Sequence, residues 1–182
     1  MTAEEKVGFG HVRIRRARTG EIDEVLAVLD EAAAWLARRG IEQWPSRFEH
    51  QWVRGGLGSK ETWLALDGDR AVGTVQLAAA DPIWDDRPGP AGYVHRLAVR
   101  REAAGLGRVL VEWASAESSR HGGAFLRLDC VAHNPGLRRY YENLGFAHAG
   151  DVEVGGPPGD RASGVPTVLV ARYERPITGG GS

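Results

Sequence analysis

Hydrophobic positions in the first half of the chain follow two periods, which predicts a mixture of helices and strands. Residues 11–15 alternate between polar and apolar side chains, as a half-buried strand does. Apolar residues then recur at helical spacing over 19–40, and a shorter helix with a proline in its first turn is expected over 45–56. The runs 62–67 and 71–78 have strand character, and the Gly-Asp pair between them suits a tight hairpin.

The second half alternates regularly between strand-like and helix-like stretches, after a loop at 81–92 that is rich in proline, aspartate and glycine. A strand, a helix and a strand in succession imply two parallel strands with a right-handed crossover. The pattern therefore predicts an α/β fold. The expected strands cover 93–99, 124–131, 146–154 and 167–173, and the expected helices cover 105–121 and 134–144.

Length and local composition indicate one domain. The chain has 182 residues, enough to bury a continuous core, and we expect the domain to cover 11–175. Residues 1–10 show no sustained period and 176–182 are rich in glycine, so both ends are expected to be flexible. The segment 155–164, which offers little to pack, is expected to be a mobile loop.

Charge and cysteine content narrow the functional classes. The 23 Lys and Arg residues against 24 Asp and Glu residues leave no basic field for nucleic acid and no polybasic signal for a membrane. The single cysteine, Cys130, excludes an internal disulfide. Neither a secretory pattern nor a run of the ~20 apolar residues that a membrane span needs is seen. We expect a cytoplasmic protein without nucleic-acid or membrane partners.

A basic, glycine-containing turn before the helix at 105–121 is a candidate anion site. Gly105 and Gly107 would let the backbone approach a ligand closely, and free N–H groups at a helix start favour an anion such as pyrophosphate. Arg100, Arg101 and Arg108 could add charge. A plain turn with solvated arginines is the alternative interpretation. A P-loop would need a lysine after the glycines, and a dinucleotide fold would need a third glycine.

The segment 134–146 has a second informative pattern. Asn134 precedes a predicted helix with two tyrosines on its apolar face, and Gly145 ends that helix. For Tyr140 we favour a packing role. The phenol of Tyr141 would need a hydrogen-bond partner, which a ligand in a cleft could supply.

These two segments resemble motifs of the GNAT acetyltransferase family. The segment 99–110 is similar to its pyrophosphate-binding Gln/Arg-x-x-Gly-x-Gly/Ala pattern. Asn134, together with the Tyr-Glu-x-x-Gly-Phe run at 141–146, is similar to a second family signature, and the order of elements over 11–173 matches as well. The sequence departs from the first pattern at Glu102, which takes the Gln/Arg position. A glutamate facing pyrophosphate would repel it, so we expect Glu102 to point away.

The resemblance implies a single-domain GNAT fold, with a mixed sheet of about six to seven strands, a splayed parallel pair and about four flanking helices. It implies transfer of an acetyl group from acetyl-CoA to a primary amine of a small molecule by direct attack. The Leu97 N–H would stabilise the oxyanion, Asn134 would contact the pantetheine arm, and Tyr141 would be the general acid. The implied cofactor-binding residues are Leu97, Ala98, Val99, Arg101, Gly105, Leu106, Gly107, Arg108, Asn134 and Tyr141.

The attacking amine must also lose a proton, which requires a base. His95 is a candidate because it lies on the strand that enters the cofactor site and shares a face with Leu97 by alternation. A histidine hydrogen-bonded within the sheet is the alternative interpretation. Asp129 and His133, near the end of the neighbouring strand, are further candidates.

The acceptor pocket, by the same resemblance, is formed by the first two helices and the loops at 81–92 and 155–164. Aromatic walls with one or two polar groups suit a small amine. For the tryptophans, ordinary packing is the alternative interpretation. The expected acceptor-binding residues are Trp35, Gln43, Trp44 and Trp84.

Other functions stay open at the level of sequence. An acyl-CoA sensor without transfer activity would share the cofactor motifs, and a protein or peptide N-acetyltransferase would differ only in its acceptor. A purely structural α/β domain would have no affinity for acyl-CoA. A homodimer is possible through edge strands. No metal is expected, because the six histidines and single cysteine show none of the familiar ligand spacings.

Overall fold

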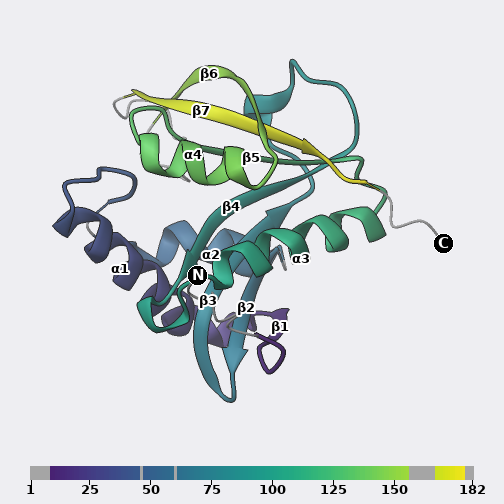
Figure 1. The fold of residues 1–182 in the computed structure, drawn as a ribbon. Coiled ribbons are helices and arrows are strands. Elements are labelled where there is room, and N and C mark those ends of the chain that lie inside the picture. Colours follow the sequence, from purple (N-terminus) through teal and green to yellow (C-terminus); the bar gives the residue numbers. More distant parts are fainter. Residues whose placement is uncertain (1–8, 46, 60, 156–166, 179–182) are drawn as a thin grey trace, which may run out of the picture.

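The computed structural model describes residues 9–45, 47–59, 61–155 and 167–178, which form a central sheet flanked by helices (Figure 1). The helices are α1 (Ile22–Arg38), α2 (His50–Gly58), α3 (Leu106–Arg120) and α4 (Pro135–Asn143). The strands are β1 (Arg13–Arg16), β2 (Thr62–Asp67), β3 (Arg70–Ala78), β4 (Ala91–Val99), β5 (Phe125–Val131), β6 (Ala147–Gly155) and β7 (Thr167–Pro176).

The strands pair in the order β1-β2-β3-β4-β5-β7-β6, and in the described part of the chain only β4 and β5 are parallel. Helix α3 connects these two strands, as the predicted crossover requires. Helices α3 and α4 contribute to one hydrophobic cluster, which includes Leu110 and Tyr141. Helices α1 and α2 contribute to another, which includes Leu29 and Val53. The fold class predicted from the sequence is confirmed.

The pairing between β4 and β5 ends partway along β4. It runs from Ala91 opposite Phe125 to Val94 opposite Leu128, and residues 95–99 have no partner in β5. Strand β5 stays paired with β7 as far as Val131. The two parallel strands therefore diverge toward their carboxyl ends, as Figure 1 shows. The backbone of β4 is thus left without a sheet partner on this side, where a ligand can reach it.

A bulge in β4 lies at the start of this unpaired stretch. Two residues of β4, Arg96 and Leu97, lie opposite the single residue Val75 of β3. Arg96 has a φ of 47°, in the left-handed region that residues with a side chain rarely adopt. Bulges bend a strand and increase its twist, so this one helps to turn β4 away from β5. It also interrupts the simple alternation on which the shared face of His95 and Leu97 was predicted.

Two helices begin later than the sequence pattern predicts. The helix expected over 19–40 starts with a 3₁₀ turn, Thr19–Glu21, and becomes α-helical at Ile22. The helix expected over 45–56 begins at His50. Phe48 explains the second difference, because its side chain is buried in the cluster with α1 and α2 while its N–H donates to the Asp30 carboxylate at 2.8 Å. Phe48 therefore packs into the core before helix α2 begins at His50.

Two described residues just outside the predicted domain limits of 11–175 make contacts with the domain. Phe9 packs against the main core, and the Ile177 N–H donates to the Ala124 carbonyl at 2.8 Å. Of the ends expected to be flexible, 1–10 and 176–182, residues 1–8 and 179–182 lie outside the described residues. So does most of the loop expected over 155–164.

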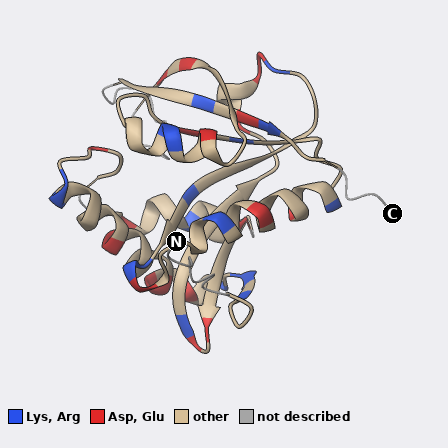
Figure 2. Cartoon of the chain, viewed as in Figure 1, with Lys and Arg blue, Asp and Glu red and all other residues tan. Residues whose placement is uncertain are grey.

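Basic and acidic residues occur on the same elements, for example on α1 and α3 (Figure 2). This agrees with the near-neutral composition. None of the described helices is long and apolar enough to cross a membrane.

Candidate active site

A cavity of 540 Å³ lies where β4 diverges from β5. Its walls come from α1 and the segment that follows it, from β4 and the turn before α3, and from the ends of β5 and α4 that face this divergence. Most of the residues that the sequence singled out line this one cavity. They are Trp35, Gln43, Trp44, His95, Leu97, Ala98, Val99, Arg101, Gly105, Gly107, Asp129, Asn134 and Tyr141.

Some predicted site residues lie elsewhere. Leu106 is fully buried in the core, so only its backbone could serve a ligand. Arg108 and His133 are exposed and are not among the residues that line the cavity. Trp84 is only 1% exposed and packs with Tyr93 in a separate small cluster. Its expected place in the acceptor pocket does not agree with this position.

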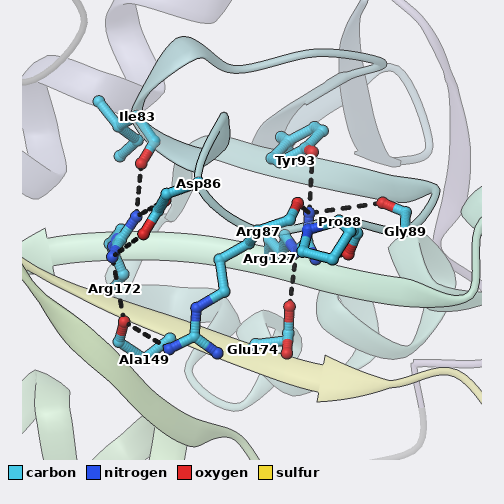
Figure 3. Close-up of polar contacts among 10 residues, drawn as sticks. All are labelled: Ile83, Asp86, Arg87, Pro88, Gly89, Tyr93, Arg127, Ala149, Arg172 and Glu174. Carbon is cyan, nitrogen blue, oxygen red and sulfur yellow. Dashed lines mark hydrogen bonds and ion pairs between the residues drawn. The ribbon is translucent and has the colours of Figure 1, made fainter.

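Two buried arginines, Arg127 on β5 and Arg172 on β7, attach the loop between β3 and β4 to the sheet (Figure 3). These contacts explain why Trp84, which belongs to this loop, is buried. The guanidinium carbons of Arg127 and Arg172 lie 5.2 Å and 5.1 Å from the Trp84 ring. Arg127 donates to the carbonyls of Arg87 and Pro88 and pairs with Glu174 at 2.6 Å. An arginine in the apolar run of β5 was the available sequence signal for this structural role.

Arg172 makes the matching contacts from β7. Its guanidinium donates to the carbonyls of Ile83 and Ala149 and pairs with Asp86 at 2.5 Å. The Arg172 side chain also holds the pKa of the Asp86 carboxyl below its usual range through these hydrogen bonds. The loop is therefore joined to the sheet at several points.

The turn before α3 has the geometry of an anion site. Gly105 precedes the helix with a φ of 98°, which favours glycine. Gly107 is buried, and a Cβ there would lie 3.0 Å from the Tyr140 hydroxyl oxygen. The first N–H groups of a helix have no partner within the helix, and its dipole favours negative charge there. The two glycines thus keep side chains away from a point where an anion can bind.

The charged residues of this turn have different partners. Arg100 donates to the Ala71 carbonyl and pairs with Glu31 at 2.5 Å. Glu102 pairs with Arg70 at 2.6 Å and does not line the cavity, so its carboxylate is kept from the anion site. Arg101 does line the cavity. Of the three arginines considered from the sequence, it is the one that lines the cavity.

Asn134 and Gln43 form a buried polar junction at the wall of the cavity. Asn134 caps α4, with its Oδ1 accepting from the Leu137 N–H at 3.1 Å. Its Nδ2 donates to Gln43 Oε1 at 3.3 Å, and the same oxygen accepts from the Val131 N–H at 3.2 Å. Gln43 thereby ties the segment after α1 to the end of β5.

Tyr141 is 7% exposed and lines the cavity from α4. Burial raises the pKa of its phenol well above the usual value, and the neighbouring Cys130 and Tyr140 add to the shift. The phenol therefore keeps its proton at neutral pH. Burial also raises the pKa of the Cys130 thiol to about 12, so this cysteine is no thiolate nucleophile.

His95 belongs to a group of three polar side chains near the same cavity. Its Nε2 lies 3.4 Å from Asp81 Oδ2, and the Asp81 side chain is 1% exposed. Asp81 is oriented in turn because its Oδ1 accepts from the Ile83 N–H at 3.2 Å. With Asp129, each side chain offers one ligand atom, and these atoms lie within 4.8 Å of one another. Such a group can accept a proton, attract an ammonium group or hold a cation.

A diverging parallel pair, an anion-binding turn, a buried protonated phenol and an imidazole therefore meet around one cavity. Together they define the class of protein as an acyl-CoA-dependent N-acetyltransferase. The chain belongs to the acetyltransferase (GNAT) family, whose family model matches residues 27–146.

Individual relatives agree with this membership. The uncharacterized N-acetyltransferase YesJ of Bacillus subtilis (strain 168) is 29% identical over 141 residues, covering 71% of this chain and 78% of the relative. The fold is similar to that of a GNAT family acetyltransferase from Listeria monocytogenes 4b F2365, with a TM-score of 0.69 and 21% identity over 91% of this chain and 95% of that one.

A further solved structure, yncA from Salmonella typhimurium, contains its cofactor acetyl-CoA. It has a TM-score of 0.63 and 13% identity, covering 94% of this chain and 96% of that chain. This similarity establishes the shared fold.

Proposed function

We propose that the protein acetylates a primary amine of a small molecule, with acetyl-CoA as donor, Tyr141 as general acid and His95 as base. One observation carries this proposal. The Gly105 turn, the unpaired backbone of residues 95–99, the buried Tyr141 phenol and the His95 imidazole surround a single cavity of 540 Å³. That volume is in the range of pockets that bind small molecules.

In the proposed reaction, the amine nitrogen attacks the thioester carbonyl carbon, and the carbon–sulfur bond then breaks. The Leu97 N–H, on the stretch of β4 that β5 leaves unpaired, donates to the developing oxyanion. Tyr141 gives its proton to the leaving thiolate. The proton that the amine loses passes to His95, whose Nε2 lies 3.4 Å from Asp81 Oδ2 and which has a ring nitrogen within 4.8 Å of a carboxylate oxygen of Asp129.

The acid role of Tyr141 makes a direct prediction. Tyr141→Phe should lower kcat by about 100-fold or more, because the thiolate would leave without its proton donor. The KM for acetyl-CoA should stay within about twofold, since the phenyl ring preserves the packing. Release of free thiol, followed with a chromogenic disulfide, measures both constants. Tyr140→Phe, one residue away, is the matched control and should keep most of the turnover, whereas equal turnover in wild type and Tyr141→Phe would exclude the acid role.

We further expect the enzyme to act in the cytoplasm, without a metal and without nucleic-acid or membrane partners, and to form homodimers. The observation that supports a dimer is that β6 is at the edge of the sheet, where its outer backbone could pair with a second copy. Light scattering behind a sizing column, over a range of protein concentrations, tests the homodimer. A chelator tests the metal, since activity should not change when one is added.

A further inference from the structure

Two guanidinium groups approach the same aromatic ring at the cavity. The guanidinium carbon of Arg39 lies 4.4 Å from the centre of the Trp35 ring, and that of Arg101 lies 4.6 Å from the same centre. Trp35 and Arg39 come from the end of α1 and the residue after it, whereas Arg101 comes from the turn that follows β4. All three residues line the cavity. A ring in contact with two cations restricts both side chains and holds them near each other.

Neither guanidinium forms an ion pair with a described carboxylate, although the Arg101 backbone N–H donates to the Glu31 carboxylate at 3.0 Å. Within the described ranges, no ion pair or hydrogen bond joins the guanidinium of Arg39 or Arg101 to a carboxylate. The neighbouring arginines differ in this respect, because Arg100 pairs with Glu31 and Arg70 pairs with Glu102. Two like charges beside one ring repel each other, and an anion bound between them would offset that repulsion.

The position of the pair indicates which anion fits. Arg101 lies in the same turn as Gly105, which opens α3, so the pair and the free N–H groups of the helix form neighbouring parts of one electropositive region. CoA carries a pyrophosphate and a 3′-phosphate, and guanidinium groups suit phosphate oxygens because of their planar array of donors. Glu102, in the same turn, pairs with Arg70 and does not line the cavity, so it offers a phosphate no donor. Arg39, the residue after α1, adds a second guanidinium to that of Arg101.

We propose that Arg39 and Arg101, held together by Trp35, form a phosphate-binding site for CoA, with Trp35 contributed by helix α1 and Arg39 by the residue after it. The inference rests on the proposed function only in taking acetyl-CoA as the ligand. It assigns Trp35 to the cofactor end of the cavity, in contrast to the acceptor role predicted from the sequence. It also makes α1 part of cofactor recognition.

The test is isothermal titration of the full chain with acetyl-CoA. Arg39→Gln should raise the dissociation constant about tenfold or more, because a charge-assisted contact with phosphate is lost. Arg38→Gln removes the same charge one residue earlier, at an exposed position that does not line the cavity, and should bind like wild type. Trp35→Leu should also weaken binding, because both guanidinium groups would lose the ring that orders them. Wild-type affinity in Arg39→Gln would overturn the inference.

Two truncated ligands identify the group that is bound. S-acetylpantetheine has no phosphate, so Arg39→Gln and wild type should bind it equally. If the penalty of Arg39→Gln persists with dephospho-acetyl-CoA, the pair binds the pyrophosphate. If the penalty disappears with that ligand, the pair binds the 3′-phosphate. A penalty that persists with S-acetylpantetheine would show that Arg39 acts on something other than phosphate.

Steady-state kinetics separate this inference from the proposed function. Arg39→Gln should raise the KM for acetyl-CoA while kcat and the KM for the amine stay near wild type. An effect confined to the KM for the amine would mean that the pair binds a carboxylate of the acceptor, which overturns the inference. Tight binding of acetyl-CoA by wild type without acetyl transfer to any amine would refute the proposed function and leave the phosphate site standing.

Discussion

At the scale of single residues, the site depends on what surrounds each reactive group. Tyr141 is enclosed by the core, and its phenol keeps its proton, whereas His95 lies beside the carboxylates of Asp81 and Asp129. These surroundings are the basis for proposing Tyr141 as the acid and His95 as the base. Gly107 acts differently, by leaving space at the start of α3.

Gly107→Glu should weaken acetyl-CoA binding at least tenfold. The new side chain would start 3.0 Å from the Tyr140 hydroxyl and place a negative charge where phosphate is expected to bind. Val109→Glu is the matched control, because Val109 is 37% exposed on the same helix and does not line the cavity. Titration calorimetry measures both affinities. Equal losses in the two variants would mean that charge on α3, and not the anion site, is responsible.

Several positions at the cavity could be predicted from the sequence, and others could not. Asn134, Tyr141, Gly105 and Gly107 belong to local motifs whose spacing is readable in one segment. Arg39 is different, because its role depends on Trp35 and on Arg101 from a segment 62 positions away in the chain. The position of Trp84 likewise follows from two arginines on distant strands.

At the scale of elements, the helices and strands are predictable from the sequence, whereas the bulge in β4 and the start of α2 depend on tertiary contacts. Periodicity predicted every helix and strand described here, because each has an apolar face that must be buried. Periodicity could not predict the bulge at Arg96. The bulge depends on how β4 pairs with β3, and the residue types in β4 do not indicate it. Periodicity also placed the start of α2 too early, because the Phe48 contacts come from the tertiary structure.

Arg127→Met tests the fastening of the loop between β3 and β4. The change leaves Glu174 and the carbonyls of Arg87 and Pro88 without their donor in a buried place, so the free energy of unfolding should fall by about 3–5 kcal/mol. Arg70→Met, which removes an exposed arginine paired with the exposed Glu102, should cost less than about 1 kcal/mol. Urea unfolding measures both. Similar costs in the two variants would contradict the structural role of Arg127.

The contact between β1 and the start of α1 should be visible in the pH dependence of stability. Hydrogen bonds from Arg15 lower the pKa of Glu21 to about 2. A lowered carboxyl pKa stabilises the folded state fully above the unfolded value of about 4.5, and this contribution is lost as the pH falls toward 2.

Glu21→Gln should therefore lose less unfolding free energy than wild type between pH 7 and pH 3, by about 1–2 kcal/mol after allowance for solvent screening. Urea unfolding at the two pH values gives the difference. Arg15→Gln removes the other partner and should show the same reduced pH dependence. An unchanged dependence in both variants would show that this ion pair does not couple folding to protonation.

At the scale of the whole molecule, the function depends on one departure from a regular sheet. Strands β4 and β5 pair only as far as Val94 and Leu128, and the 540 Å³ cavity lies where they diverge. Helices α1, α3 and α4 each bring residues to that place, so a single domain gathers groups from distant parts of the chain. The alternation of elements predicts the parallel pair, but only pairing in three dimensions determines where it opens.

The most direct test of this account is calorimetric titration of the purified protein with acetyl-CoA, followed by a screen of amines for thiol release in the same preparation. We predict saturable binding of acetyl-CoA and release of CoA with at least one small primary amine. Binding without release from any amine or peptide would contradict the assignment as a transferase and favour an acyl-CoA sensor. The absence of any binding would contradict the whole account.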